Sequence, residues 1–172
     1  MGASDRFTRE RLTNKHLAWL ERLPAETVLD GDILLTHGAP GNDLQYCLET
    51  VDASGVRAAT EDEIISRLGS VHHSLILCGH THIPRVFQLS DGRLVVNPGS
   101  VGLQAYDDSK PVPHIVQTGS PEARYAIVER KGSKFVVDLR KVSYDYLPAA
   151  DQASRNGRLE WSTALQTGRL KG

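Results

Sequence analysis

The chain has few cysteines, almost no net charge and no long apolar run, and each shortage argues against a class of protein. Two cysteines in 172 residues, with no CxxC pair, argue against a disulfide-stapled fold and fit a reducing, cytoplasmic compartment. Twenty basic residues against twenty-one acidic ones give a formal net charge of -1, so we expect no broad nucleic-acid surface and no membrane surface. The apolar runs have only strand length, which predicts neither a membrane span nor a signal core.

A chain of this length can bury one hydrophobic core. We therefore expect a single domain over residues 1–172, with a packing helix in 1–24, a sheet core over 25–147 and a helical tail over 148–172. Thr13 suits the N-cap of the packing helix.

Two apolar runs predict neighbouring parallel strands. The run 33–36 follows the turn dipeptide Asp30-Gly31 and ends at His37. A capping-box pattern starts a helix over 60–68, and the second apolar run, 75–78, follows that helix. Because this order is that of a βαβ crossover, the histidines that follow the two runs should meet at one edge of the sheet.

The remaining pattern predicts a mixed α/β chain without repeats. The expected elements are a helix over 13–23, a hairpin of 27–29 with 33–36, a hairpin of 85–89 with 93–97, a loop over 102–122, an antiparallel edge pair of 125–130 with 135–141, and a weak helix after 148 with Trp161 and Leu165 on one face.

The most specific motif is Gly79-His80-Thr81-His82, placed directly after an apolar strand. Open α/β folds gather their ligands at the carboxyl ends of strands, and neutral imidazole binds borderline transition metals. With His37 at the end of the other strand, the pattern indicates metal-assisted hydrolysis. Two divalent ions held close together also need carboxylate ligands, and the sequence offers no convincing candidate for them.

Three segments in order resemble the calcineurin-like metallophosphoesterase superfamily, in its small bacterial and archaeal phosphodiesterase branch. They are 33–38, 78–84 and 97–102, and the resemblance runs from about Leu12 to Arg140. It implies an αββα sandwich that binds two divalent ions, often manganese, iron or zinc, with a hydroxide that attacks phosphorus.

Carried over to this sequence, the resemblance implies that His37 and His80 bind one ion and His82 the other. It also implies an Asp-x-His strand, a Gly-Asp loop and a Gly-Asn-His loop before this region, and all three are missing here. Gly31-Asp32 and Gly41-Asn42-Asp43 are decoys by order and composition. We therefore expect a partial domain, the carboxyl-terminal portion of the enzyme, with an incomplete metal site and little activity alone.

Several interpretations stay open at this point. The leading one is a metal-dependent phosphoesterase that acts on a small phosphorylated substrate or a phosphodiester. A non-catalytic scaffold is the alternative, since a retromer subunit resembles this fold, and an exposed sheet edge would then favour a partner or self-association. A single zinc site with three histidines ranks last. Met1 is either a true start or an internal methionine.

Other polar residues carry weaker hypotheses. Asn97 lies in an Asn-Pro-Gly-Ser segment, for which we favour a turn over a role beside the metals. We expect His72-His73 to be loop histidines at the opposite edge. Lys110 and His114 could reach an anionic substrate, but we favour a solvated loop for both. No catalytic residue is assigned.

Overall fold

A computed structural model describes residues 2–170 of the chain. Met1, Lys171 and Gly172, which the sequence analysis includes in the domain, lie outside the described residues. The helices are α1 (Ala3–Arg11), α2 (Asn14–Leu20), α3 (Glu61–Leu68), α4 (Leu147–Arg155) and α5 (Leu159–Thr167). The strands are β1 (Thr27–Leu29), β2 (Ile33–Leu35), β3 (Glu49–Asp52), β4 (Gly55–Ala58), β5 (Leu75–Leu77), β6 (Arg85–Gln88), β7 (Leu94–Asn97), β8 (Ala105–Asp108), β9 (His114–Gln117), β10 (Ala123–Lys131) and β11 (Lys134–Val142).

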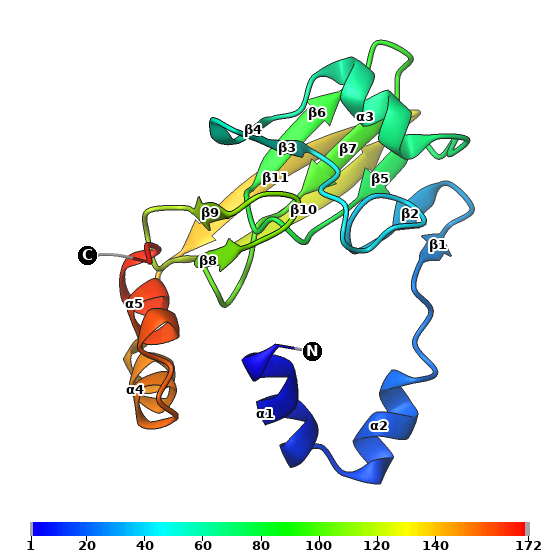
Figure 1. Ribbon diagram of the computed structural model, residues 1–172. Helices are drawn as coiled ribbons and strands as arrows, with labels where there is room; N and C mark the ends of the chain where they lie inside the picture. The colour runs from blue at the N-terminus through cyan, green and yellow to red at the C-terminus, as the bar shows by residue number, and fades with distance from the viewer. Residues whose placement is uncertain (1, 171–172) are drawn as a thin grey trace.

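A five-stranded sheet in the order β1-β2-β5-β7-β6 forms the centre of the molecule (Figure 1). Strands β2, β5 and β7 are parallel, with Leu34 opposite Ile76 and Ile76 opposite Val95. These strands are continuous apolar runs, as expected for strands covered on both faces. The outer strands β1 and β6 pair antiparallel through short hairpins, as the sequence predicts.

Different layers cover the two faces of this sheet. On one face, Ile64 and Leu68 of α3 pack in a buried cluster with Ile76 and Val95. On the other face, the two-stranded sheet β10–β11 places residues such as Phe135 against the sheet. The resulting α/β sandwich confirms the predicted fold class, including the antiparallel pair near the carboxyl end.

Helix α3 begins as its sequence pattern predicts. The Thr60 hydroxyl accepts a hydrogen bond from the Glu63 amide, and the Glu63 carboxylate accepts one of 2.7 Å from the Thr60 amide. Arg57 of β4 donates to the same carboxylate, which lowers the pKa of Glu63. These contacts fix the start of the helix that carries the chain from β2 to β5.

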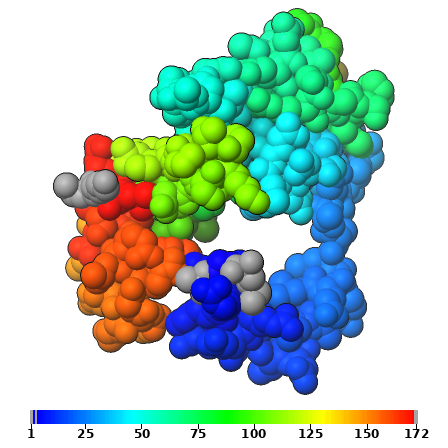
Figure 2. All heavy atoms as spheres, viewed as in Figure 1, coloured from blue at the N-terminus to red at the C-terminus, as the bar shows by residue number. Residues whose placement is uncertain are grey.

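The amino-terminal helices differ from the expectation of a single packing helix. The structure divides this region into α1 and α2, and no residue of α2 is buried. Trp19 is 55% exposed. Figure 2 shows α1 against the carboxyl-terminal helices, where Arg158 donates to Ser4 Oγ, and open space between α2, with the segment that follows it, and the rest of the molecule. The sequence predicts a helix here, but the observed helix ends at Leu20 rather than Leu23 and its leucines are not buried.

Residues 102–122 are the second difference, because they contain the hairpin β8–β9 where the sequence predicts a loop. Pro111 and Pro113, which suggest a loop, lie in the turn between the two strands. The hairpin β3–β4 is likewise absent from the sequence-based prediction. The tail after 148 forms two helices, α4 and α5.

Among residues 2–170, no helix combines the length and hydropathy that a membrane crossing requires.

The buried face of α3 should be sensitive to the loss of one methyl group. Ile64 is fully buried, whereas Ile127 on β10 is 41% exposed. We expect Ile64→Val to lower the free energy of unfolding in urea by ~0.5 to 1.5 kcal/mol. The same change at Ile127 should cost less than ~0.5 kcal/mol. Equal costs at the two positions would contradict the assignment of α3 to the core.

Candidate functional site

The carboxyl ends of β2 and β5 bring two of the predicted ligands together. Backbone pairing continues past both strands, since the Thr36 amide donates to Leu77 O at 3.0 Å and the Gly79 amide donates to His37 O at 2.8 Å. The rings of His37 and His80 consequently lie with their centroids 4.8 Å apart. The predicted crossover thus accounts for the meeting of these histidines.

His82 belongs to the same cluster. Burial lowers the pKa of His80, and the nearby His37 and His82 lower it further. Burial also lowers the pKa of His82, an effect that its bond to Leu103 opposes and His37 reinforces. His80 and His82 therefore favour the neutral imidazole, the form that binds metals.

The histidine loop has a strained backbone. His80 and His82 have φ angles of 65° and 60°, in the left-handed region that side chains other than glycine seldom adopt. Each such residue costs of order 1–3 kcal/mol unless the surroundings compensate it. Such strain gathers at functional sites, and here it falls on the two histidines of the motif.

Asn97 braces this loop from the neighbouring strand β7. Its Nδ2 donates to Gly79 O at 2.7 Å and to Thr81 Oγ1 at 2.9 Å, and its Oδ1 accepts from the Gly99 amide at 2.9 Å. The side chain is 1% exposed. Asn97 therefore makes the turn that the sequence favours and also holds the Gly79 carbonyl and the Thr81 side chain, on either side of His80.

A single contact sets the tautomer of His82. Its Nδ1 lies 2.8 Å from Leu103 O, and a carbonyl can only accept a hydrogen bond. Nδ1 therefore carries the proton, and Nε2 keeps a free lone pair. Histidines that bind metals commonly have this arrangement.

A buried network of two tyrosines and a histidine supports His80 from the other side. The Tyr46 hydroxyl lies 2.8 Å from His114 Nε2 and 3.0 Å from the Tyr106 hydroxyl, which in turn donates to His80 O at 3.2 Å. Because His114 Nδ1 donates to Val112 O, Nε2 accepts from Tyr46 when the ring is neutral. The Tyr46 ring also meets the His80 ring edge-on.

This network corrects the prediction that His114 is a solvated loop residue. His114 is 6% exposed and begins β9. Sequence reasoning missed Tyr46 and Tyr106 altogether, since their role depends on the unpredicted hairpin β8–β9. His114 and Val116 are buried and Ile115 and Gln117 exposed, but the sequence His-Ile-Val-Gln does not alternate polar with apolar residues, so it gave no local signal for β9.

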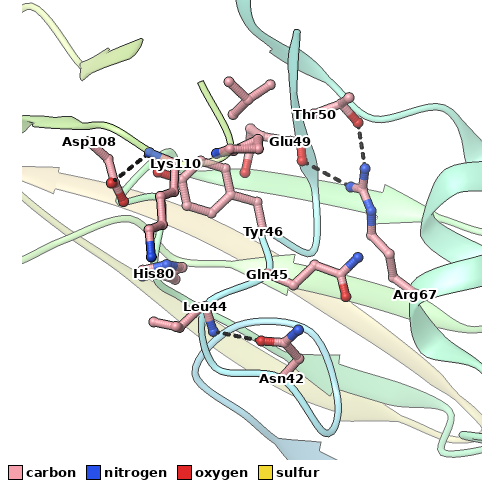
Figure 3. A pocket seen from close by; sticks show the side chains of 12 residues that line it. Asn42, Leu44, Gln45, Tyr46, Glu49, Thr50, Arg67, His80, Asp108 and Lys110 are labelled. Atoms are coloured by element: carbon pink, nitrogen blue, oxygen red, sulfur yellow. Dashed lines mark hydrogen bonds between the residues drawn. The ribbon is translucent and has the colours of Figure 1, made fainter. Parts of the chain in front are cut away.

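A cavity of about 650 Å³ opens beside His80 (Figure 3). The loop that follows His37 forms one wall, and it folds so closely that a Cβ on Gly38 would lie 2.6 Å from Asp43 O and Gln45 O. Lys110 is exposed, as predicted, and lines the same cavity. An anion at the histidine edge would therefore lie near a cationic side chain.

Of the residues that the sequence analysis leaves out of the site, His72, His73 and Asp32 lie away from the cluster, whereas Asn42 lines the cavity beside His80. His72 is exposed and His73 partly buried, both before the amino end of β5. The Asp32 carboxylate accepts from the Ser74 amide at 2.8 Å and pairs with Arg130, so it serves the opposite end of the sheet. Asn42 caps its own turn by accepting from the Leu44 amide. The two decoy motifs are thus structural.

The described residues fit part of a metal centre. The imidazoles of His37, His80 and His82 are suitable donors for a transition metal. Within residues 2–170, however, no three His, Cys, Asp or Glu side chains are arranged to hold an ion. This finding contradicts the alternative of a complete three-histidine zinc site. The described residues bring the imidazoles together, and the carboxylate of Asp108 lines the cavity beside His80 and acts on its pKa.

Comparison with solved structures identifies similar folds. A metallophosphoesterase from Sphaerobacter thermophilus matches with a TM-score of 0.67 and 24% identity, over 93% of this chain and 64% of that one. The chain therefore spans slightly less than two thirds of that protein. Vps29 from Entamoeba histolytica, as a D62A mutant, matches with a TM-score of 0.41 and 16% identity, over 73% of this chain and 63% of that one, and a score this low supports no argument.

Comparison of sequences identifies the family. No curated protein matches this chain. The family model described as the calcineurin-like phosphoesterase superfamily domain matches residues 2–120, which is more than half of the sequence. The chain belongs to the calcineurin-like phosphoesterase superfamily.

Proposed function

We propose that this chain contributes the imidazole ligands of a metal-dependent phosphoesterase that hydrolyses a phosphodiester or phosphomonoester in the cytoplasm. The observation that carries the proposal is the cluster of His37, His80 and His82 at the carboxyl edge of the sheet. Its strained loop is held by Asn97, as expected where geometry matters for function.

The roles of the residues follow from their positions. His37 and His80 would hold one divalent ion and His82 a second, with manganese, iron or zinc as the candidate metals. Such ions, when bound, supply a nucleophile by lowering the pKa of water and polarise the phosphoryl oxygens. The carboxylate ligands would come from outside the described residues, so turnover by the chain alone should be slow.

The protein's own groups orient the ligands. The Leu103 carbonyl holds the proton of His82 on Nδ1, so that Nε2 is free to bind a metal. Tyr106 donates to the His80 backbone, and the Tyr46 ring packs edge-on against the His80 ring. This rigid surround would limit reorganisation when an ion binds.

A non-catalytic scaffold is the second candidate. It is favoured by the incomplete donor set and by β1, in which every residue is exposed, with Val28 at 45% and Leu29 at 46%. A strand with an open edge can pair with a partner chain or with a second copy. The scaffold candidate predicts association that does not depend on metal.

Removal of an imidazole should weaken metal binding. We expect His80→Asn and His82→Asn each to lower the affinity for Zn²⁺ or Mn²⁺ by about tenfold or more, measured by isothermal titration calorimetry. Asparagine is chosen because it tolerates the left-handed backbone at these positions. His72→Asn, at the opposite end of β5, should leave the affinity unchanged. Equal affinities for all of these proteins would refute metal ligation.

Asn97 should affect metal affinity only through the histidine loop that it holds, since it is not itself a proposed ligand. Asn97→Asp keeps the acceptor for the Gly99 amide but removes the donors to Gly79 and Thr81. We expect a loss of about 10- to 100-fold in metal affinity, with the exposed Asn156→Asp as the control. If Asn97→Asp lowers thermal stability but leaves metal affinity intact, Asn97 has only a structural role.

Hydrolysis of bis(4-nitrophenyl) phosphate tests the function itself. With Mn²⁺ the chain should show slow turnover that a chelator abolishes and His80→Asn reduces at least about tenfold. Turnover that is unaffected by either treatment would reject the phosphoesterase proposal. Light scattering on the same samples tests the scaffold: a stable, metal-independent complex without turnover would favour it.

A further inference from the structure

A chain of side-chain contacts runs from the β8–β9 turn to the histidine loop. Val112 O lies 2.8 Å from His114 Nδ1, and His114 Nε2 lies 2.8 Å from the Tyr46 hydroxyl. The Tyr46 hydroxyl lies 3.0 Å from the Tyr106 hydroxyl, which lies 3.2 Å from His80 O. His114 and Tyr46 are buried, and Tyr106 is partly buried. A carbonyl of the turn is thus linked to the carbonyl of a proposed metal ligand.

The protons in this chain can be counted from its ends. A carbonyl can only accept a hydrogen bond, so Tyr106 gives its one hydroxyl proton to His80 O. Tyr46 must then give its own proton to Tyr106, because the contact between the two hydroxyls also needs one. The contact of Tyr46 with His114 is left to a proton on Nε2, and the contact with Val112 O to a proton on Nδ1. All four contacts are hydrogen bonds only when the His114 ring carries both protons.

A neutral His114 ring leaves one of these contacts without a proton. Nε2 then accepts from Tyr46, and the two tyrosine hydroxyls have one proton left for two contacts. If Tyr106 gives that proton to Tyr46, the bond to His80 O is lost. Burial raises the pKa of both tyrosines, so neither hydroxyl ionises at neutral pH. The protonation of His114 therefore decides whether the chain is complete at His80.

The carboxylates around the ring favour its protonated form. Asp108 of β8 lies directly opposite His114 in the hairpin register, at a spacing where opposite charges stabilise each other. Asp108 and the buried Glu49 also act on both tyrosines of the chain. These carboxylates oppose the cost of burying a charged ring. The other titratable and charged groups on the elements packed against the chain are Asp107 of β8, the exposed Lys110 of the turn, Arg57 of β4 with its partners Asp52 and Glu63, Arg85 with its partner Glu49, and the rings of His80 and His82.

We propose that His114, in its doubly protonated form, is a positioning residue for the histidine loop, acting through Tyr46 and Tyr106 on the His80 carbonyl. The support is complete where the His114 ring is charged, and it weakens as the pH rises and the ring becomes neutral. This effect on the loop needs no metal. Only its consequence for a bound ion rests on the proposed function.

Nuclear magnetic resonance of the metal-free, ¹⁵N-labelled chain tests the proposal between about pH 5 and 8, the range in which histidine titrates. We expect His114 to carry protons on both ring nitrogens at the low end and to lose the Nε2 proton as the pH rises. The amides of Gly79 and Thr81 are hydrogen-bonded to His37 O and Gly79 O. Their protection from hydrogen exchange, corrected for the intrinsic rate, should fall by about three- to tenfold over the same interval.

Matched variants separate this role from ordinary packing. Glutamine can donate from the position of Nε2 at every pH, so His114→Gln should keep the low-pH protection throughout. Tyr106→Phe removes the donor to His80 O and should keep the high-pH protection throughout. His72→Gln, an exposed position before the amino end of β5, should leave the pH profile unchanged. His80 and His82 are present in all of these proteins, so their own titration cancels in the comparison. The wild type and Tyr106→Phe suffice if His114→Gln does not fold.

The outcomes distinguish this inference from the proposed function. A His114 ring with one proton at the low end of the range overturns the inference, as does protection that stays constant while the ring titrates. A pH profile that persists in Tyr106→Phe, or in a folded His114→Gln, also overturns it. If the histidines bind Zn²⁺ and the profile is flat, this inference alone fails. If the profile is present and calorimetry detects no Zn²⁺ binding, the inference holds and the proposed function fails.

Discussion

The parallel register of β2, β5 and β7 is the constraint on which the candidate site depends. It pairs Leu35 with Leu77, so that β2 and β5 end at the same edge of the sheet. His37 and His80, which are more than forty residues apart in the sequence, therefore come together there. The same register places Asn97, the last residue of β7, beside the histidine loop. A shift of one residue along β5 would turn its buried side chains to the other face of the sheet and separate these groups.

The site shows how a strained segment is maintained by ordinary packing and hydrogen bonds. The left-handed conformations of His80 and His82 are held by hydrogen bonds from neighbouring groups to their loop: the buried Asn97 and the partly buried Tyr106 and Leu103. The described residues provide this rigid imidazole half and an adjoining polar cavity. In our proposal the chain supplies the imidazole ligands of a dinuclear centre.

Much of the fold could be predicted from the sequence, because its strongest signals are local. The turn at Asp30-Gly31, the capping box at Thr60 and the apolar strand before Gly79 each specify their own conformation, and together they predict the crossover and its histidine edge. The β8–β9 hairpin could not be predicted, because its strands have four residues each and the prolines between them indicate a loop. The support that Tyr46 and His114 give to His80 depends on that hairpin and went unseen with it.

The most direct measurement of the central claim is X-ray absorption at the zinc edge, on the chain loaded with one equivalent of Zn²⁺. The account predicts nitrogen ligands at about 2.0 to 2.1 Å with the multiple-scattering signature of at least two imidazoles. It also predicts that this signature weakens in His80→Asn. A first shell made only of oxygen, or an imidazole signal that the substitution leaves unchanged, would contradict the account.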